Sequence, residues 1–202
     1  MPLKFANNQS LTSTTALPAA VPTDNLILIS TQTASNSANI SFTTGLDSTY
    51  DAYEFHFIDV APRSTDAQFS FQGSTNSGSS YGVTATTTFF YAIHNEDDAS
   101  TTLSYLTSND LAQSTSFQPI SGGSRNTADE CLTGILQIFN PSSTTYVKHF
   151  IARTQSVHRT PASLDSYIAG YFNTTSAVNA IQFKYENGNI DGTIKLYGVK
   201  KS

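Results

Sequence analysis

The chain has 202 residues, a formal net charge of −5 and 12% charged residues, about half of the usual share. This length suits one domain with a substantial core, and the lack of a basic run argues against a nucleic-acid-binding surface. Ser, Thr, Asn and Gln take the place of charges, and the 11% of Phe and Tyr is too high for a disordered chain. The single cysteine, Cys131, excludes an internal disulfide and a multi-cysteine metal site.

The first 24 residues differ in composition from the rest of the chain. Pro2, Pro18 and Pro22 interrupt a Thr/Ser/Ala-rich run that has neither a strand nor a helical period, and it contains no apolar core of a signal peptide. We therefore expect residues 1–24 to be an extended arm ahead of a β-sandwich body at 25–202. The arm is expected to anchor the body on a neighbouring protein or copy through its apolar side chains, which are Leu3, Phe5, Leu11, Leu17 and Val21.

From residue 26 onward, apolar and polar residues alternate. In "YDAYEFHFIDV", Tyr53, Phe55 and Phe57 fall on one face, whereas Glu54, His56, Ile58 and Val60 fall on the other. A period of two is typical of half-buried antiparallel strands. The other stretches that predict strands are "LILISTQT", "ANISFTTG", "DAQFSFQG", "YGVTATTTFFYAI", "TTLSYLT", "CLTGILQIFN", "TTYVKHFIARTQSV", "SYIAGYF", "AVNAIQFKY" and "GTIKLYGV".

About ten strands, spaced by roughly 8 to 16 residues and joined by Gly/Asn/Ser turns, predict an all-β antiparallel sandwich or barrel, with a jelly roll as the favoured version. The stretch "ENGNIDG" between the last two strands predicts a hairpin, because Asn-Gly accepts the positive φ angles of a tight turn. No segment has a helical period over three turns. The absence of heptads and of repeats argues against a fibre shaft.

The stretch "YAIHNEDDAS" is the densest group of ionisable residues. It makes Glu96, Asp97 and Asp98 candidate ligands for a divalent ion, with His94 nearby. Calcium loops, however, use alternate oxygen ligands and a glycine, whereas these acids are adjacent. A solvated loop after the strand that ends in "FFYAI" is the favoured interpretation, so we expect no metal and no cofactor.

Glu54 and His56 are two residues apart on a predicted strand and therefore share a face. They could act as a catalytic base and the group that orients it, although a structural pair is the favoured interpretation. Cys131 follows two acidic residues, Asp129 and Glu130, which raise the pKa of a thiol, so we expect a packed and unreactive side chain.

Two further histidines, His149 and His158, lie close in the sequence to the basic residues Lys148, Arg153 and Arg159. They could form a small cationic patch, but ordinary solvated strand residues are the favoured interpretation.

The chain has no Gly-x-Ser-x-Gly elbow, no Walker loop and no prominent pair of acids of the kind a glycosidase needs. Several tyrosines near predicted strand ends suit glycan contacts, a protein interface or the rim of the core, and they are Tyr50, Tyr53, Tyr81, Tyr91, Tyr105, Tyr167 and Tyr171.

The opening "MPLKFANNQSLTSTTALPAA" and the stretches "ISFTTGLDSTYDAYEFHFIDVAP", "NPSSTTYVKHF", "GYFNTTSAVNAIQFK" and "NIDGTIKLYGV" resemble virion structural proteins of tailed marine bacteriophages, including cyanophage-like viruses. The resemblance spans nearly the whole chain, and the family has no assigned active site to carry over. It implies a late-expressed, non-enzymatic particle component without a cofactor, made in the host bacterial cytoplasm.

We therefore expect an exterior capsid decoration or head-fibre module that is mounted by its arm. Its partners would be other virion proteins of the capsid or tail and copies of itself, with a trimer as the expected state. A receptor-binding tail-fibre module that recognises a host-surface glycan is the alternative, and a depolymerase is a third possibility. Nothing in the sequence predicts membrane insertion.

Overall fold

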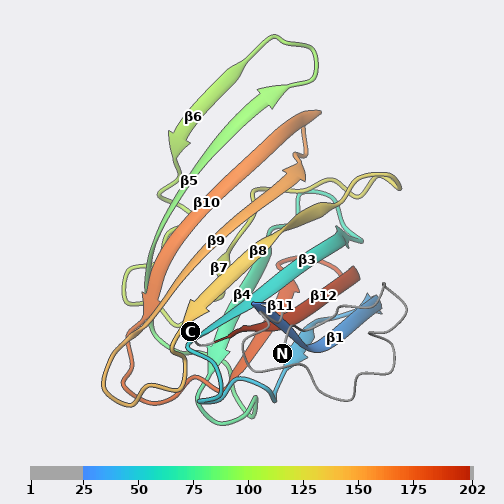
Figure 1. The fold of residues 1–202 in the computed structure, drawn as a ribbon. Coiled ribbons are helices and arrows are strands. Elements are labelled where there is room, and N and C mark those ends of the chain that lie inside the picture. The colour runs from blue at the N-terminus through green and yellow to red at the C-terminus, as the bar shows by residue number, and fades with distance from the viewer. Residues whose placement is uncertain (1–24, 201–202) are drawn as a thin grey trace, which may run out of the picture.

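The computed structural model describes residues 25–200, which form twelve strands and no helix. The strands are β1 (Leu26–Ser37), β2 (Ile40–Phe42), β3 (Ala52–Pro62), β4 (Phe69–Ser74), β5 (Ala85–Asn95), β6 (Thr101–Tyr105), β7 (Gln118–Pro119), β8 (Leu132–Phe139), β9 (Lys148–Val157), β10 (Ala162–Phe172), β11 (Ala180–Tyr185) and β12 (Ile190–Val199). They form an eight-stranded sheet of order β1-β12-β3-β8-β9-β10-β5-β6 and a four-stranded sheet of order β2-β11-β4-β7 (Figure 1). All pairs are antiparallel, which confirms the predicted sandwich.

Eight of the strands have jelly-roll connectivity. The row β1-β12-β3-β8 and the row β2-β11-β4-β7 pair the first strand of the set with the last, the second with the seventh, the third with the sixth and the fourth with the fifth. The other four strands, β5, β6, β9 and β10, are inserted as two pairs and lengthen the first sheet only. We call the part of the long sheet formed by β10, β5 and β6 the overhang; β5 and β6 lie at the end farthest from β1 (Figure 1).

The core between the sheets consists largely of phenylalanine. Phe183 on β11 lies 5.1 Å from Phe55 and 5.3 Å from Phe57 of β3, measured between ring centroids, and both contacts are edge-to-face. Phe69 on β4 stacks on Phe183 at 5.8 Å. Each fully buried ring of this kind contributes about 1.5–3 kcal/mol to stability. These contacts confirm the inward face that the alternation in β3 predicts for its aromatic residues.

The predicted hairpin at "ENGNIDG" is wrong. Gly188 does have a positive φ of 78°, so the turn itself is present. However, β11 pairs with β2 and β4, whereas β12 pairs with β1 and β3. The turn therefore carries the chain from one sheet to the other, because in a jelly roll consecutive strands often belong to opposite sheets.

The expected outward position of Val60 is also wrong. The pairing of β3 with β8 shifts between Phe57 and Val60, and Asp59 within this bulge has a φ of 51°. A bulge inserts one residue and reverses the alternation that follows it. Val60 therefore points into the core and is fully buried, whereas Ile58 points outward as expected. The two-residue strand β7 has no alternation to detect and was not among the expected strands.

Residues 1–24 lie outside the described part of the chain, and with them the expected anchoring residues Leu3, Phe5, Leu11, Leu17 and Val21. The arm stays a prediction. Within residues 25–200, no helix is long and apolar enough to cross a membrane.

Candidate functional site

The acidic stretch at 94–98 forms the tip between β5 and β6. His94 Nε2 lies 2.9 Å from Asp98 Oδ1, and the two side chains are 57% and 91% exposed. Asp98 has a φ of 57°, and Asp97 Oδ1 accepts a hydrogen bond from the backbone of Ala99 at 3.0 Å. These contacts within the turn are those of a solvated loop. Among the described residues, no group of three or more His, Cys, Asp or Glu side chains could hold a metal ion. The contact from another part of the fold is a backbone one, in which the N–H of Glu96 donates to the carbonyl of Pro161 at 3.0 Å.

Glu54 and His56 lie on the outer face of the long sheet and contact each other. His56 Nε2 is 2.9 Å from Glu54 Oε2, and Gln137 on β8 donates to Glu54 Oε1 at 3.2 Å. The His56 ring also packs against Tyr197 with centroids 4.7 Å apart. Each polar group therefore has a structural partner on the sheet, as the favoured interpretation of this pair expects.

The basic residues do not form one patch. Lys148 is buried, and its Nζ donates to the carbonyl oxygens of Tyr146 at 2.5 Å and Thr174 at 3.0 Å. Burial lowers the pKa of Lys148 below its ordinary value. Arg153 pairs with Asp165 on the outer face of the long sheet, whereas Arg159, in the loop after β9, pairs with Asp66, in the loop before β4. These two cationic side chains therefore lie in different places.

Cys131 is a half-buried thiol beside Asp59. Its Sγ donates to Asp59 Oδ1 at 3.8 Å. Burial, with the nearby charge of Asp59 as a second cause, raises the pKa of the thiol. This environment disfavours the reactive thiolate, as expected, although the responsible acid is Asp59 rather than Asp129 or Glu130.

Three loops that are far apart in the sequence meet beside the overhang. The backbone N–H of Asp66, in the loop before β4, donates to the carbonyl of Ser124 at 2.8 Å. The N–H of Arg159, in the loop after β9, donates to the carbonyl of Gly123 at 2.8 Å. The loop after β7 therefore holds the other two loops in place.

Between these loops and the overhang lies a depression of about 630 Å³, which we call the groove. Its size falls in the range of small-molecule sites. It is lined by Asp66, Gln68, Phe89, Tyr91, Ile93, Leu106, Ser108, Asn109, Gly122, Gly123, His158, Arg159, Leu164, Glu186 and Asn187.

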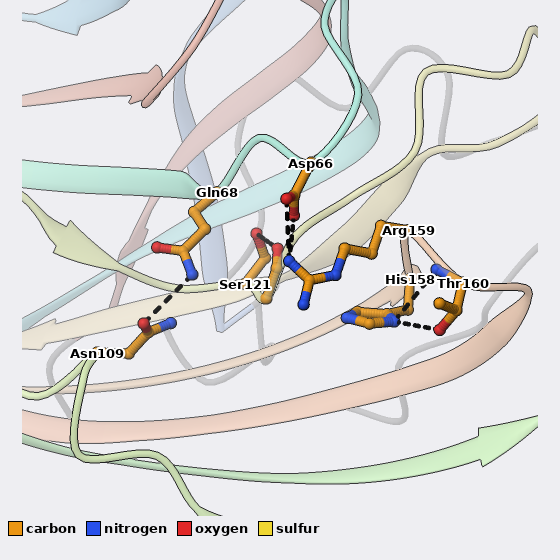
Figure 2. Close-up of polar contacts among 8 residues, drawn as sticks. Asp66, Gln68, Asn109, Ser121, His158, Arg159 and Thr160 are labelled. Carbon is orange, nitrogen blue, oxygen red and sulfur yellow. Dashed lines mark hydrogen bonds and ion pairs between the residues drawn. The ribbon is translucent and has the colours of Figure 1, made fainter.

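An ion pair closes one side of the groove. Arg159 Nη1 donates to both carboxylate oxygens of Asp66 at 2.9 Å, and each side chain is about half exposed (Figure 2). Asp66 has a φ of 58°, a left-handed conformation that Asp tolerates better than most residues. A Cβ on Gly123 would collide with the Asp66 carboxylate, so any larger residue there would displace this carboxylate from its present position.

His158, next to this pair, is held as a neutral imidazole. Thr160 contacts Nδ1 through its hydroxyl at 2.8 Å, and its backbone N–H donates to the same nitrogen at 3.4 Å. Burial, together with the positive charge of Arg159, lowers the pKa of His158 below its ordinary value of 6.5. Because Nδ1 accepts the N–H of Thr160, the neutral ring carries its proton on Nε2.

Asn109 lies on the opposite side of the groove and is only 4% exposed. Its Oδ1 accepts a hydrogen bond from Gln68 Nε2 at 3.2 Å, and its backbone oxygen accepts one from Gln118 Nε2 at 2.9 Å (Figure 2 shows the Gln68 contact). Gln118 is fixed in turn by Thr87, whose hydroxyl donates to its Oε1 at 2.5 Å. The Asn109 Nδ2 has no hydrogen-bond partner among the described residues.

The outer face of the long sheet carries exposed apolar side chains. Phe90 on β5 stacks on Tyr167 of β10 with ring centroids 4.8 Å apart, and the Arg153 guanidinium lies 4.9 Å from the centre of the Tyr167 ring. Leu103 is 74% exposed and Ile151 49%. We call this surface the outer strip, and it consists of Phe90, Leu103, Tyr105, Ile135, Ile151 and Tyr167.

The predicted tyrosines have different environments. Tyr91 lines the groove, Tyr105 and Tyr167 belong to the outer strip, and Tyr53 is fully buried with its hydroxyl bonded to the loop before β3. Asn109, Gln68 and the Asp66–Arg159 pair were not predicted as a site. Their positions are separated by inserted strands, so spacing in the sequence contains no signal for their proximity.

No protein-family model, curated protein or solved structure matches this chain.

Proposed function

We propose that the chain is a non-enzymatic structural protein of a tailed-bacteriophage particle, an exterior capsid decoration or head-fibre module mounted by residues 1–24. The observation that supports this role best is the outer strip. Three of its members, Ile135 on β8, Ile151 on β9 and Phe90 on β5, are 42%, 49% and 41% exposed, and Tyr167 lies on β10 between β9 and β5. A contiguous exposed apolar surface of this kind is typical of a contact with another protein.

The occupant that we propose for the outer strip is the arm of a neighbouring copy. Residues 1–24 contain apolar side chains and only two charged residues, Lys4 and Asp24, so their composition matches an apolar surface. Fully extended, 24 residues reach roughly 80 Å, which is enough to cross from one body to the next. Arg153 and Asp165, the charges beside the strip, already pair with each other at 2.7 Å and require no partner from the arm.

Two carboxylate–histidine pairs support a role without catalysis. Glu54–His56 and His94–Asp98 each bond to each other, and they lie on the outer face and at a loop tip rather than together in the groove. Release of reducing ends from host polysaccharide during long incubation with the chain would contradict a non-enzymatic role.

The mounting model is tested first in solution. We expect the full chain to form a closed oligomer in analytical ultracentrifugation, with a trimer as the expected state, and the chain without residues 1–24 to be a folded monomer. Ile135→Ser combined with Ile151→Ser should also give a monomer, because it removes the apolar contact. The control is Tyr146→Ser, which changes a still more exposed side chain (70%) outside the strip. An oligomer that survives both the truncation and the double substitution would refute the model.

The particle role is tested separately. Mass spectrometry of purified particles of the encoding virus should detect the chain, and a cryo-EM map should place it on the outside of the head. Particles that lack the chain would refute the proposal. A position on the tail would favour the alternative of a receptor-binding module, for which the groove is the relevant surface.

A further inference from the structure

We infer that the groove is a binding site for a neutral saccharide. This inference is independent of the mounting model, because the groove and the outer strip lie on opposite faces of the long sheet and share no residue.

The amide nitrogen of Asn109 is unpaired among the described residues. A buried donor without a partner costs about 1–3 kcal/mol, and native structures retain few such groups. Asn109 is 4% exposed, and its Nδ2 has no partner among the described residues, yet the residue lines the groove. An acceptor oxygen on a ligand in the groove would satisfy this donor.

The side-chain amide of Asn109 is held in one orientation. Gln68 holds Oδ1 of Asn109, and Gln118 holds its backbone oxygen. Because Gln68 donates to Oδ1, rotation of the Asn109 amide alone would lose this bond, which favours the direction that Nδ2 has. Preorganised polar groups lose little entropy when a ligand binds, which is typical of recognition sites.

The overhang supplies another part of the groove lining. Phe89 and Leu164 on the overhang line the groove but are almost completely buried, so the half-buried Tyr91 on β5 supplies the accessible aromatic ring. A sugar ring has a C–H face and a rim of hydroxyls. The Tyr91 ring, with amide, carboxylate and guanidinium groups around it, complements both parts of such a sugar ring.

The charge of the groove lining limits which ligands fit. Asp66 and Arg159 bond to each other and cancel, and His158 is neutral near pH 7 because its pKa is lowered. Glu186 remains as an exposed acid. The groove therefore has no surplus positive charge for a phosphate, sulfate or sialic acid, so an uncharged hydroxyl-rich ligand fits better.

The experiment has two stages. The full chain is first screened on an array of neutral and acidic bacterial oligosaccharides, and the best neutral binder is then titrated into the isotopically labelled chain with protein-observed NMR spectra. We expect neutral glycans to bind and to perturb the groove resonances of Tyr91 and Asn109. Binding restricted to acidic glycans, or no neutral glycan bound at millimolar concentration, would overturn the inference.

Variants locate the site. Asn109→Asp keeps an oxygen for Gln68 and replaces the donor by a carboxyl oxygen, so it should weaken binding about tenfold. Tyr91→Ala should have a similar effect and changes no fully buried residue, so it serves if the buried substitution unfolds the chain. The control is Tyr171→Ala, which removes an equally half-buried tyrosine from the other face of the same sheet. Binding that both groove variants retain at wild-type strength would exclude the groove as the site.

Discussion

At the scale of single residues, one hydroxyl group organises the loop before β3. The Tyr53 hydroxyl accepts hydrogen bonds from the backbone N–H groups of Asp47 at 3.1 Å and Tyr50 at 3.4 Å, and it lies 2.9 Å from Asp47 Oδ1. The alternation in the sequence predicts that the Tyr53 ring faces inward, but it contains no information on which backbone groups the hydroxyl meets.

Replacing this hydroxyl should destabilise the fold. Tyr53→Phe leaves the N–H groups of Asp47 and Tyr50 without their acceptor, so the free energy of unfolding should fall by about 1–3 kcal/mol in a urea titration. Tyr146→Phe, at an exposed position, should change it by less than about 0.5 kcal/mol. Equal effects of the two substitutions would show that the buried hydrogen bonds contribute nothing.

Lys148 should make stability depend on alkaline pH. Its pKa in the folded chain is lower than the ordinary value of 10.5, because burial disfavours the charged form. The unfolded chain therefore binds more protons between the two pKa values, and stability rises with pH in this window. In urea titrations as the pH is raised toward 10.5, Lys148→Met should lose this rise, whereas Lys195→Met on the outer face should keep it. A rise of the same size in Lys148→Met would contradict the assignment.

At the scale of elements, close approaches between a strand and its neighbours decide which side chain is tolerated. Gly198 on β12 pairs with Tyr53 on β3, and the Tyr50 ring lies directly over it. Tyr50 also packs edge-to-face on Tyr53, with ring centroids 5.7 Å apart. The loop before β3 is therefore fixed to two strands by one tyrosine ring.

A methyl group at Gly198 should displace this ring. A Cβ at this position would collide with Tyr50, so Gly198→Ala should lower the free energy of unfolding by about 1–3 kcal/mol. Combining it with Tyr50→Ala removes the collision, and the double variant should lose less stability than the sum of the two single variants. Strict additivity in chemical denaturation would mean that Gly198 and Tyr50 do not interact.

At the scale of the whole molecule, the long sheet differs between its middle and its overhanging end. β3 and β12 contribute inward side chains that are fully buried beneath the second sheet, whereas β6 is an edge strand on which four of five residues are exposed. Local opening is easiest where few apolar contacts resist it.

Hydrogen exchange should report this gradient. Amides of β6 should exchange first, and amides of β3, β8 and β12 should exchange last, near the rate set by global unfolding. Mass spectrometry of peptides from each strand would measure the order. Protection of β6 equal to that of β3 would indicate that the overhang is covered, for example by a neighbouring copy. The same measurement on the chain without residues 1–24 would then show whether the cover depends on these residues.

The sequence by itself determined the all-β class and the inward face of strands such as β3 and β9, because alternation records which side chains leave water. It also located the solvated loop at 94–98 and the turn at Gly188. Its prediction of a hairpin there failed, since the local preference for a turn does not state which sheet receives the next strand.

Only the tertiary structure decided which distant residues share a surface. The groove joins Asp66, Asn109 and Arg159, which belong to loops separated by inserted strands. The reversal at Val60 likewise depends on a bulge that forms when β3 pairs with β8. The physical reason is common to both cases: alternation is a local property of the chain, whereas strand order and register are settled by the packing of the two sheets against each other.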